Sequence, residues 1–259
     1  MKPRHRRAVL LAAVLVGTAA MAAPAAPARA GVSPEARLPD LAVLAPSDIR
    51  IFVRGSGKKV IRFTSIVVNV GRGPFQLTGA ADDGYANRKD ILKVRQQVLE
   101  PDGTFTAIDT PATMFWSGDG HDHWHVTGIQ VAEVRGVDGE HEALRYKKTG
   151  FCFFDSHRYT SKKAPFYTPA RSVCQTKTNG RVPMGVSVKW GDIYPASIAY
   201  QWIDVTDLPD GKYRLRVTAD PTDVDGGAFL ESDETNNLGW TKIRIEGTKV
   251  TILKRSPRP

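Results

Sequence analysis

The sequence has few cysteines, few histidines and little aromatic content. Its 259 residues include two cysteines, six histidines and 8% aromatic residues. Two cysteines allow one disulfide and do not by themselves indicate a soft metal site. The chain also lacks internal repeats, long helical patterns and a second apolar stretch that could cross a bilayer. With 41% hydrophobic and 24% charged residues, it is neither collagen, nor a coiled coil, nor a wholly disordered chain.

The N-terminus has the pattern of a secretory signal peptide. Four basic residues among the first seven precede an apolar run at 8–23, and an Ala-Arg-Ala cleavage motif ends at position 30. The sequence therefore predicts removal of residues 1–30, a secreted, extracellular protein and no membrane association after cleavage. A membrane anchor is the alternative, which is disfavoured because the run is short and broken by proline. Arg6 and Arg7 leave Sec and twin-arginine export both open.

The net charge depends strongly on this N-terminal segment. The whole chain carries a formal charge of +9, but residues 1–30 hold five of the 36 basic residues and none of the 27 acidic ones. The remaining chain therefore carries +4. No run of basic residues interleaved with aromatics is found, so we expect no nucleic-acid partner.

The two cysteines, Cys152 and Cys174, are expected to form a disulfide, because the chain is predicted to be secreted. Such a bond closes a loop of about 20 residues, and loop entropy gives it a stabilisation of roughly 3 kcal/mol.

Apolar residues alternate with period two along most of the chain, which predicts an all-β fold, a β-sandwich with long loops. Residues 155–189 lack this alternation and predict one long loop of functional importance. The tail, 256–259, is expected to be flexible. The predicted strands cover residues 60–70, 75–77, 91–99, 124–134, 143–154, 200–205, 213–218 and 241–245.

Three of the six histidines lie within five residues, at His121, His123 and His125. On a strand, residues i, i+2 and i+4 share one face, so the three imidazoles are expected together, with Asp122 and Trp124 pointing the other way. This pattern predicts a metal site; a solvated polar face or a chance cluster is the alternative.

A straight strand would spread the three histidines over about 13 Å, too far for one ion. The strand must therefore bend or begin inside the motif, and Gly118 and Gly120 offer that freedom. All-nitrogen ligation suits copper, zinc or iron, and the affinity order favours copper. The spacing alone does not choose between copper and zinc.

The segment GHDHWHV at 120–126 resembles the copper-binding motif of the lysyl oxidase family. Four further segments resemble family motifs in the same order, so the resemblance covers residues 39–246. Vertebrate members have more cysteines and carry a tryptophan and a further histidine where this chain has Gly118 to Gly120. The four other segments are Pro-Asp-Leu at 39–41, KTGFC at 148–152, Asp-Ile-Tyr at 192–194 with QWID at 201–204, and ESDETNN at 231–237.

The resemblance implies that residues 31–255 form a catalytic domain, a copper-dependent amine oxidase. Its expected substrates are primary amines or lysine side chains of proteins, and its second substrate is molecular oxygen. Aldehyde, hydrogen peroxide and ammonia are the expected products. The cofactor would be lysine tyrosylquinone, made by the protein from Lys148 and Tyr194; Lys147 is the neighbouring competitor. His121, His123 and His125 would be the copper ligands.

A catalytic base and a calcium site complete the expected machinery. Asp192 lies two residues before Tyr194 and shares its face on an extended strand, which makes it the candidate base; a solvated or turn-forming carboxylate is the alternative. Hard oxygen ligands in a short acidic loop suit calcium, and a polar turn is the alternative there. The loop offers Glu231, Asp233, Asn236 and Asn237 as calcium ligands, and the family resemblance implies that Asp40 and the carbonyl of Leu41 join them.

Two other functions remain open. The first is a non-catalytic secreted β-sandwich that binds calcium or copper and acts as an interaction module. The second is a copper-holding protein or a zinc hydrolase built on the three histidines; hydrolysis would need a metal-bound water and a nearby general base.

Overall fold

A computed structural model describes residues 31–118, 122–137, 143–146, 148–221 and 227–259 of the chain. Within these residues it contains three antiparallel sheets and one short 3-10 helix, Pro169–Arg171, and no α-helix. The predicted all-β sandwich is confirmed. No helix in the described part of the chain is long and apolar enough to cross a membrane.

The first sheet is organised by one long central strand, β3 (Lys59–Asn69). One end of β3 pairs with β2 and β14, and the other end pairs with β1 and β13, while β11 extends the sheet from β13. Because it lies between neighbours along its whole length, β3 is mostly buried. The partner strands are β1 (Leu41–Val43), β2 (Ser47–Val53), β11 (His157–Arg158), β13 (Trp190–Tyr194) and β14 (Trp202–Asp204).

The other two sheets have the strand orders β10-β7-β6-β5-β4-β12 and β17-β16-β15-β8-β9. The second sheet consists of β4 (Phe75–Ala80), β5 (Ile91–Leu99), β6 (Phe105–Trp116), β7 (Trp124–Thr127), β10 (Gly150–Phe151) and β12 (Val182–Val186). The third consists of β8 (Gln130–Gly136), β9 (Leu144–Arg145), β15 (Gly211–Ala219), β16 (Leu238–Glu246) and β17 (Lys249–Arg255).

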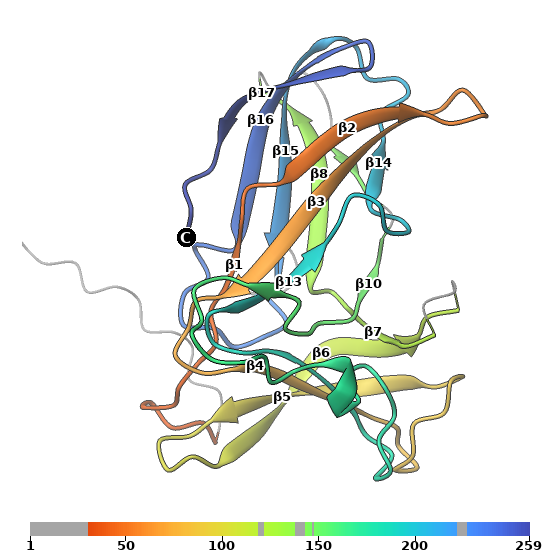
Figure 1. Ribbon diagram of the computed structural model, residues 1–259. Coiled ribbons are helices and arrows are strands. Elements are labelled where there is room, and N and C mark those ends of the chain that lie inside the picture. Colours follow the sequence, from red (N-terminus) through yellow and green to blue (C-terminus); the bar gives the residue numbers. More distant parts are fainter. Residues whose placement is uncertain (1–30, 119–121, 138–142, 147, 222–226) are drawn as a thin grey trace, which may run out of the picture.

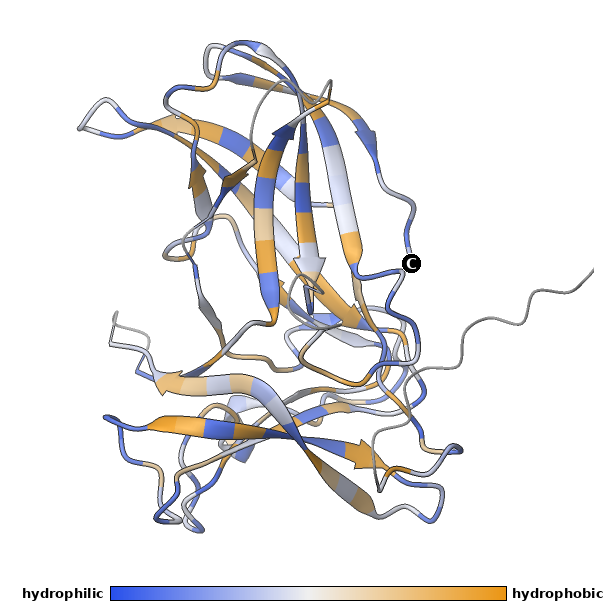
Figure 2. Cartoon of the chain, turned by 180° about the vertical axis from the view of Figure 1, so that it is seen from behind, coloured by the Kyte–Doolittle hydropathy of each residue, from blue (hydrophilic) through white to orange (hydrophobic). Residues whose placement is uncertain are grey.

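The first and third sheets face each other, and the second sheet closes one end of this sandwich (Figure 1). A single buried cluster joins all three, with Phe63 from β3, Trp124 from β7 and Leu215 from β15 each fully buried. Hydrophobic and hydrophilic residues alternate along the strands of the third sheet, as a sheet with one buried face requires (Figure 2).

Three predictions about the strands were wrong. Residues 124–134 form two strands rather than one, because Gly128, with φ +73°, turns the chain between β7 and β8. In the described part of residues 143–154, only β9 and β10 are strands. Residues 155–189 are not one loop, since Val182–Val186 pairs with β4. Strands β1, β2, β6, β13 and β17 were not predicted.

The predicted disulfide between Cys152 and Cys174 is present. The tail after β17 contacts the body of the protein at two points. The amide of Ser256 donates to the carbonyl of Trp240 at 2.8 Å, and the Arg258 guanidinium lies 4.8 Å from the centre of the Tyr159 ring. The flexibility of this tail stays a prediction. Residues 1–30 lie outside the described part of the chain.

Candidate active site

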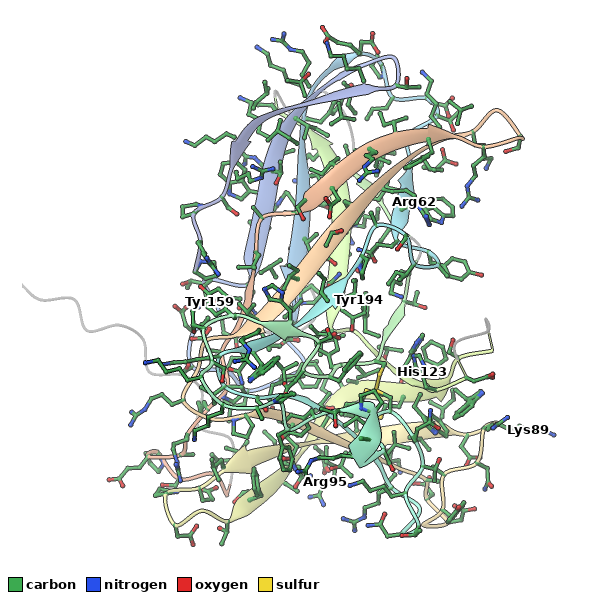
Figure 3. All side chains as sticks on the ribbon, in the orientation of Figure 1. Arg62, Lys89, Arg95, His123, Tyr159 and Tyr194 are labelled. Carbon is green, nitrogen blue, oxygen red and sulfur yellow. A yellow bond between two sulfur atoms is a disulfide. The ribbon has the colours of Figure 1, made fainter. Side chains whose placement is uncertain are left out.

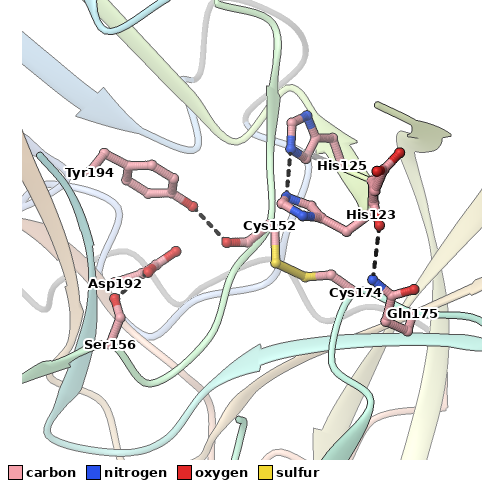
Figure 4. Close-up of a disulfide and its surroundings, with 9 residues drawn as sticks. His123, His125, Cys152, Ser156, Cys174, Gln175, Asp192 and Tyr194 are labelled. Carbon is pink, nitrogen blue, oxygen red and sulfur yellow. Dashed lines mark hydrogen bonds between the residues drawn. A yellow bond between two sulfur atoms is a disulfide. The ribbon is translucent and has the colours of Figure 1, made fainter. Parts of the chain in front are cut away.

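The histidine motif lies at the start of β7, which begins at Trp124, inside the motif as its geometry required. Asp122 has φ +47° and makes the turn into the strand. Trp124 is fully buried and points into the core, where its indole donates to Thr176 at 3.0 Å. His123 and His125 place their Nε2 atoms 3.0 Å apart (Figure 4). His121 and Gly120 lie outside the described residues.

This pair of imidazoles fits two neighbouring ligands of one metal ion. With nitrogen–metal bonds of about 2.0 Å, a nitrogen–nitrogen separation of 3.0 Å corresponds to a ligand–metal–ligand angle of about 97°. The His125 side chain is 5% exposed, and the ring of Phe115 packs edge-on against it at 5.7 Å. The motif therefore combines the right donor atoms with a largely buried setting, which suits copper or zinc.

Lys148 and Tyr194, the expected cofactor precursors, lie against a shared aromatic side chain. The Nζ atom of Lys148 is 5.1 Å from the centre of the Phe151 ring and 5.6 Å from that of the Tyr194 ring. Phe151 and Tyr194 meet edge to face at 5.0 Å. Both precursors are buried, at 8% and 6% exposure. Lys147 lies outside the described residues.

The phenol of Tyr194 is fixed by the backbone, since it donates a hydrogen bond of 2.9 Å to the carbonyl of Cys152 (Figure 4). Cys152 is bonded to Cys174, whose own carbonyl accepts from the amide of Trp124 at 2.9 Å. The disulfide therefore links the segment that holds Tyr194 to the strand that begins at the histidine motif. Figure 3 places Tyr194 and His123 in the same part of the molecule.

Asp192 is fully buried beside Tyr194 on β13. The hydroxyl of Ser156 donates to its carboxylate at 2.5 Å and accepts from the amide of Ile193 at 2.9 Å. Burial raises the pKa of Asp192 to about 7. Burial also raises the pKa of Tyr194 well above its usual value, and the nearby charge of Asp192 adds to that effect.

A cavity of about 220 Å³ is lined by both His125 and Lys148, whereas Tyr194 and Asp192 are not among its lining residues. Gly150 makes this arrangement possible. A Cβ atom at Gly150 would lie 2.7 Å from the Cβ of His125 and 2.6 Å from the Cζ of Phe115, so only glycine lets β10 pack this closely on β7. The other lining residues are Phe115, Ser117, Gly118, Thr149 and Tyr200.

Sequence reasoning did not find Phe115, Phe151 and Tyr200 as site residues. Phe115 lies on β6, which was not predicted, and Tyr200 stands in a turn with φ +58°. Phe151 is part of the KTGFC segment, so its spacing from Lys148 was the one available signal.

Five of the six expected calcium ligands gather where β1 meets the loop before β16. Glu231 is almost fully buried and accepts from the amide of Leu41 and, at 3.1 Å, from the side-chain amide of Asn237. The carboxylate of Asp40 accepts from the side-chain amide of Asn236 at 2.7 Å. These contacts tie β1 to the loop before β16.

The acidic part of this cluster differs from the expected set. Asp233 is exposed, and its Oδ1 atom accepts from the amide and hydroxyl of Thr235 in its own loop. Asp220 and Glu234, which were not predicted, have carboxylate oxygens within 4.8 Å of an oxygen of Glu231 and of each other. Burial, with the charges of Asp220 and Glu234, raises the pKa of Glu231 well above its usual value. Glu234 belongs to the acidic motif, whereas no sequence signal marked Asp220.

Comparison with known proteins places most of the chain in one family. The family model described as "Lysyl oxidase" matches residues 78–254, which include the histidine motif, Lys148 and Tyr194. The chain belongs to the lysyl oxidase family, as its motifs suggested. Asp40 and Leu41 precede the matched region.

Individual relatives are distant and longer. Protein-lysine 6-oxidase of Gallus gallus is 28% identical over 165 residues, which are 63% of this chain and 35% of that protein. The protein of the same name from Homo sapiens is 28% identical over 169 residues, 64% of this chain and 37% of that protein. Lysyl oxidase homolog 1 of Homo sapiens is 35% identical over 104 residues, 40% of this chain and 16% of that protein. The matched part of the chain thus spans about a third of each protein-lysine 6-oxidase. It spans a smaller share, 16%, of lysyl oxidase homolog 1.

Proposed function

We propose that this protein is a secreted, copper-dependent amine oxidase that uses a quinone made from its own Lys148 and Tyr194. It converts primary amines, or lysine side chains of proteins, to aldehydes. One observation carries the proposal: the imidazoles of His123 and His125 face each other, His125 and the buried Lys148 line one cavity, and that lysine lies 5.6 Å from a buried tyrosine ring. Membership of the lysyl oxidase family supports it.

The reaction balances with oxygen and water as co-reactants. The amine carbon loses two electrons and its carbon–nitrogen bond, oxygen gains the two electrons to become hydrogen peroxide, and water supplies the aldehyde oxygen as ammonia leaves. Copper held by His121, His123 and His125 would supply the one-electron chemistry that matures the cofactor, and the quinone would accept the two electrons of the amine.

The chain's own residues bind and orient the amine. A cavity of about 220 Å³ is smaller than the 300–1,000 Å³ typical of drug-sized ligands, so it suits the end of an alkylamine or a lysine side chain. The aromatic side chains of Phe115 and Tyr200 line the cavity and would pack along the alkyl part of the substrate.

Asp192 is the proposed base. With a pKa of about 7, its carboxylate is ionised in a useful fraction at neutral pH and still basic enough to accept a proton from the carbon that bears the amine. Its contact with Ser156 holds the carboxylate in place on β13.

Bound calcium would stabilise the junction between β1 and the loop before β16. The proposed ligands are Asp40, Leu41, Glu231, Asp233, Asn236 and Asn237. This cluster also supports the second candidate function, a secreted calcium-binding interaction module without catalysis. The close approach of Asp220, Glu231 and Glu234 is the observation that favours it.

Three variants of the copper-loaded protein test the proposed oxidase. Tyr194→Phe and Lys148→Arg are expected to abolish peroxide release from alkylamines and the redox-cycling quinone stain, while the copper content stays unchanged. Tyr85→Phe removes a hydroxyl from an exposed ring and is the matched control. Full turnover by Tyr194→Phe would refute the quinone assignment. Wild-type protein that binds calcium but releases no peroxide from alkylamines would support the interaction module.

A further inference from the structure

The outer face of the third sheet is strongly basic. On β15, Tyr213, Leu215 and Val217 point into the core, so the alternate residues Lys212, Arg214 and Arg216 point outward. These outward positions are hydrophilic bands on the strands that face the viewer in Figure 2. β8, β16 and β17 add further cations to the same face. The basic face is defined by Arg135, Lys212, Arg214, Arg216, Lys242, Arg244 and Lys254.

Strand register places four of these cations in one row. Arg135 on β8 is the cross-strand partner of Arg214, which is the partner of Lys242, which is the partner of Lys254. Paired residues of antiparallel strands share a face, and neighbouring strands lie about 4.8 Å apart, so the row extends over about 14 Å. Sequence reasoning missed this patch because each strand contributes only one member to the row.

This arrangement opposes the stability of the free protein. Like charges on directly opposite residues of neighbouring strands destabilise a sheet. The row contains three such pairs, and Lys212 opposite Arg244 is a fourth. Glu133, buried among them, forms ion pairs with Arg216 at 3.1 Å and Arg135 at 3.4 Å. Glu133 also pairs with Arg145 at 3.6 Å, and the exposed Glu246 lies on the same outward side of β16 as Arg244. These two carboxylates offset only part of the repulsion among the described residues of the face.

The face offers charge without an open stacking surface. Trp240 is the cross-strand partner of Arg216, but the guanidinium of Arg214 lies over its ring at 4.7 Å. Proteins that bind single-stranded nucleic acids combine a basic groove with aromatic rings on which the bases stack, so a charged polymer without bases fits this surface better.

We propose that the basic face binds a linear sulfated polysaccharide and, resting on the secretion proposed above, so holds the protein on an acidic extracellular matrix. Arginine binds oxyanions with two parallel hydrogen bonds, and lysine binds them as a point charge. Ligand binding would neutralise the row of like charges that the free sheet carries. None of the seven residues lines the cavity beside Lys148, so a bound chain leaves that cavity open. An amine substrate is cationic, so this face does not serve to attract it.

Heparin is the probe, with the full mature chain. The double variant Arg214→Gln/Lys242→Gln removes the centre of the row. The matched control Lys89→Gln/Lys162→Gln removes the same charge from exposed loop positions. Lys89 is labelled in Figure 3.

The face variant is expected to bind heparin about tenfold more weakly at low salt and with a shallower salt dependence, since two ion contacts are lost. The control stays within about twofold of wild type. The thermal midpoint of the face variant should not fall, since like-charge pairs are removed.

Three results would overturn the proposal: no heparin binding at low salt, an equal loss in both double variants, or unchanged binding to fully desulfated heparin. A single-stranded oligonucleotide of matched charge is the last arm. If it binds as tightly as heparin and depends on the same two residues, the face is a nucleic-acid surface and the polysaccharide assignment is wrong.

Discussion

The side chain of Lys148 lies with its amino group 5.6 Å from the centre of the Tyr194 ring, although 46 positions separate the two residues in the sequence. Phe151 contacts both, and the carbonyl of Cys152 accepts from the tyrosine hydroxyl. The two side chains therefore lie in a buried, aromatic setting in which a backbone carbonyl fixes the tyrosine hydroxyl.

The first prediction concerns Asp192 and the pH dependence of turnover. Because its pKa is raised to about 7, the amine oxidation rate is expected to rise with pH through about 7 as the carboxylate ionises. Asp192→Asn should lower kcat by roughly 10²-fold to 10⁴-fold, the range for loss of a general base, and should remove this limb of the profile. Ser33→Ala, distant in sequence and outside the site, is the control. An unchanged pH profile in Asp192→Asn would rule out Asp192 as the base.

A second prediction is that Asp192 makes the free energy of unfolding depend on pH. A carboxyl whose pKa is raised on folding from 3.8 to about 7 binds more protons in the native state between these values. Its contribution to the free energy of unfolding is therefore greatest below about pH 4 and is lost as the pH rises through about 7. Urea denaturation at several pH values measures this slope, and Asp192→Asn should flatten it.

A third prediction concerns Gly150. Gly150→Ala is expected to push β10 away from His125, because the new methyl group would lie under 3 Å from the Cβ of His125 and from Phe115. Overpacking of this kind costs about 1–3 kcal/mol, and copper affinity should fall as the imidazole pair is disturbed. Gly55→Ala is the control, since no atom lies within 4 Å of a Cβ there. Wild-type copper affinity and stability in Gly150→Ala would contradict the close packing of β10 on β7.

A fourth prediction concerns calcium. Saturating calcium should raise the thermal midpoint of the wild-type protein, because a ligand that binds only the native state stabilises it. Glu231→Gln should abolish the shift. Asp220→Asn and Asp233→Asn separate the two ligand sets, since Asp220 lies close to Glu231 whereas Asp233 bonds within its own loop. No calcium shift in the wild type would refute the site.

Much of the fold was predictable from the sequence because it depends on local alternation. The strands at 60–70, 91–99 and 213–218 are half-buried or buried on a regular pattern, and they appear close to their predicted bounds. Strand β13 was missed since Gly191 and buried Asp192 interrupt its apolar pattern, and β17 was missed since it is almost wholly exposed.

The candidate site was predictable only in part. The spacing of the histidines required a strand that begins within the motif, and β7 does so. The proximity of Lys148 to Tyr194 is set by tertiary packing on Phe151, which no local pattern encodes. The closeness of Asp220 to Glu231, and the row of cations across four strands, likewise depend on pairing between distant segments.

The central claim is that Lys148 and Tyr194 become covalently joined, and peptide mapping of the copper-loaded protein tests it directly. The account predicts a cross-linked peptide pair containing residues 148 and 194, absent from protein kept free of copper and from Tyr194→Phe. Copper-loaded protein in which both peptides remain separate and unmodified, or in which Lys147 carries the link, would contradict it.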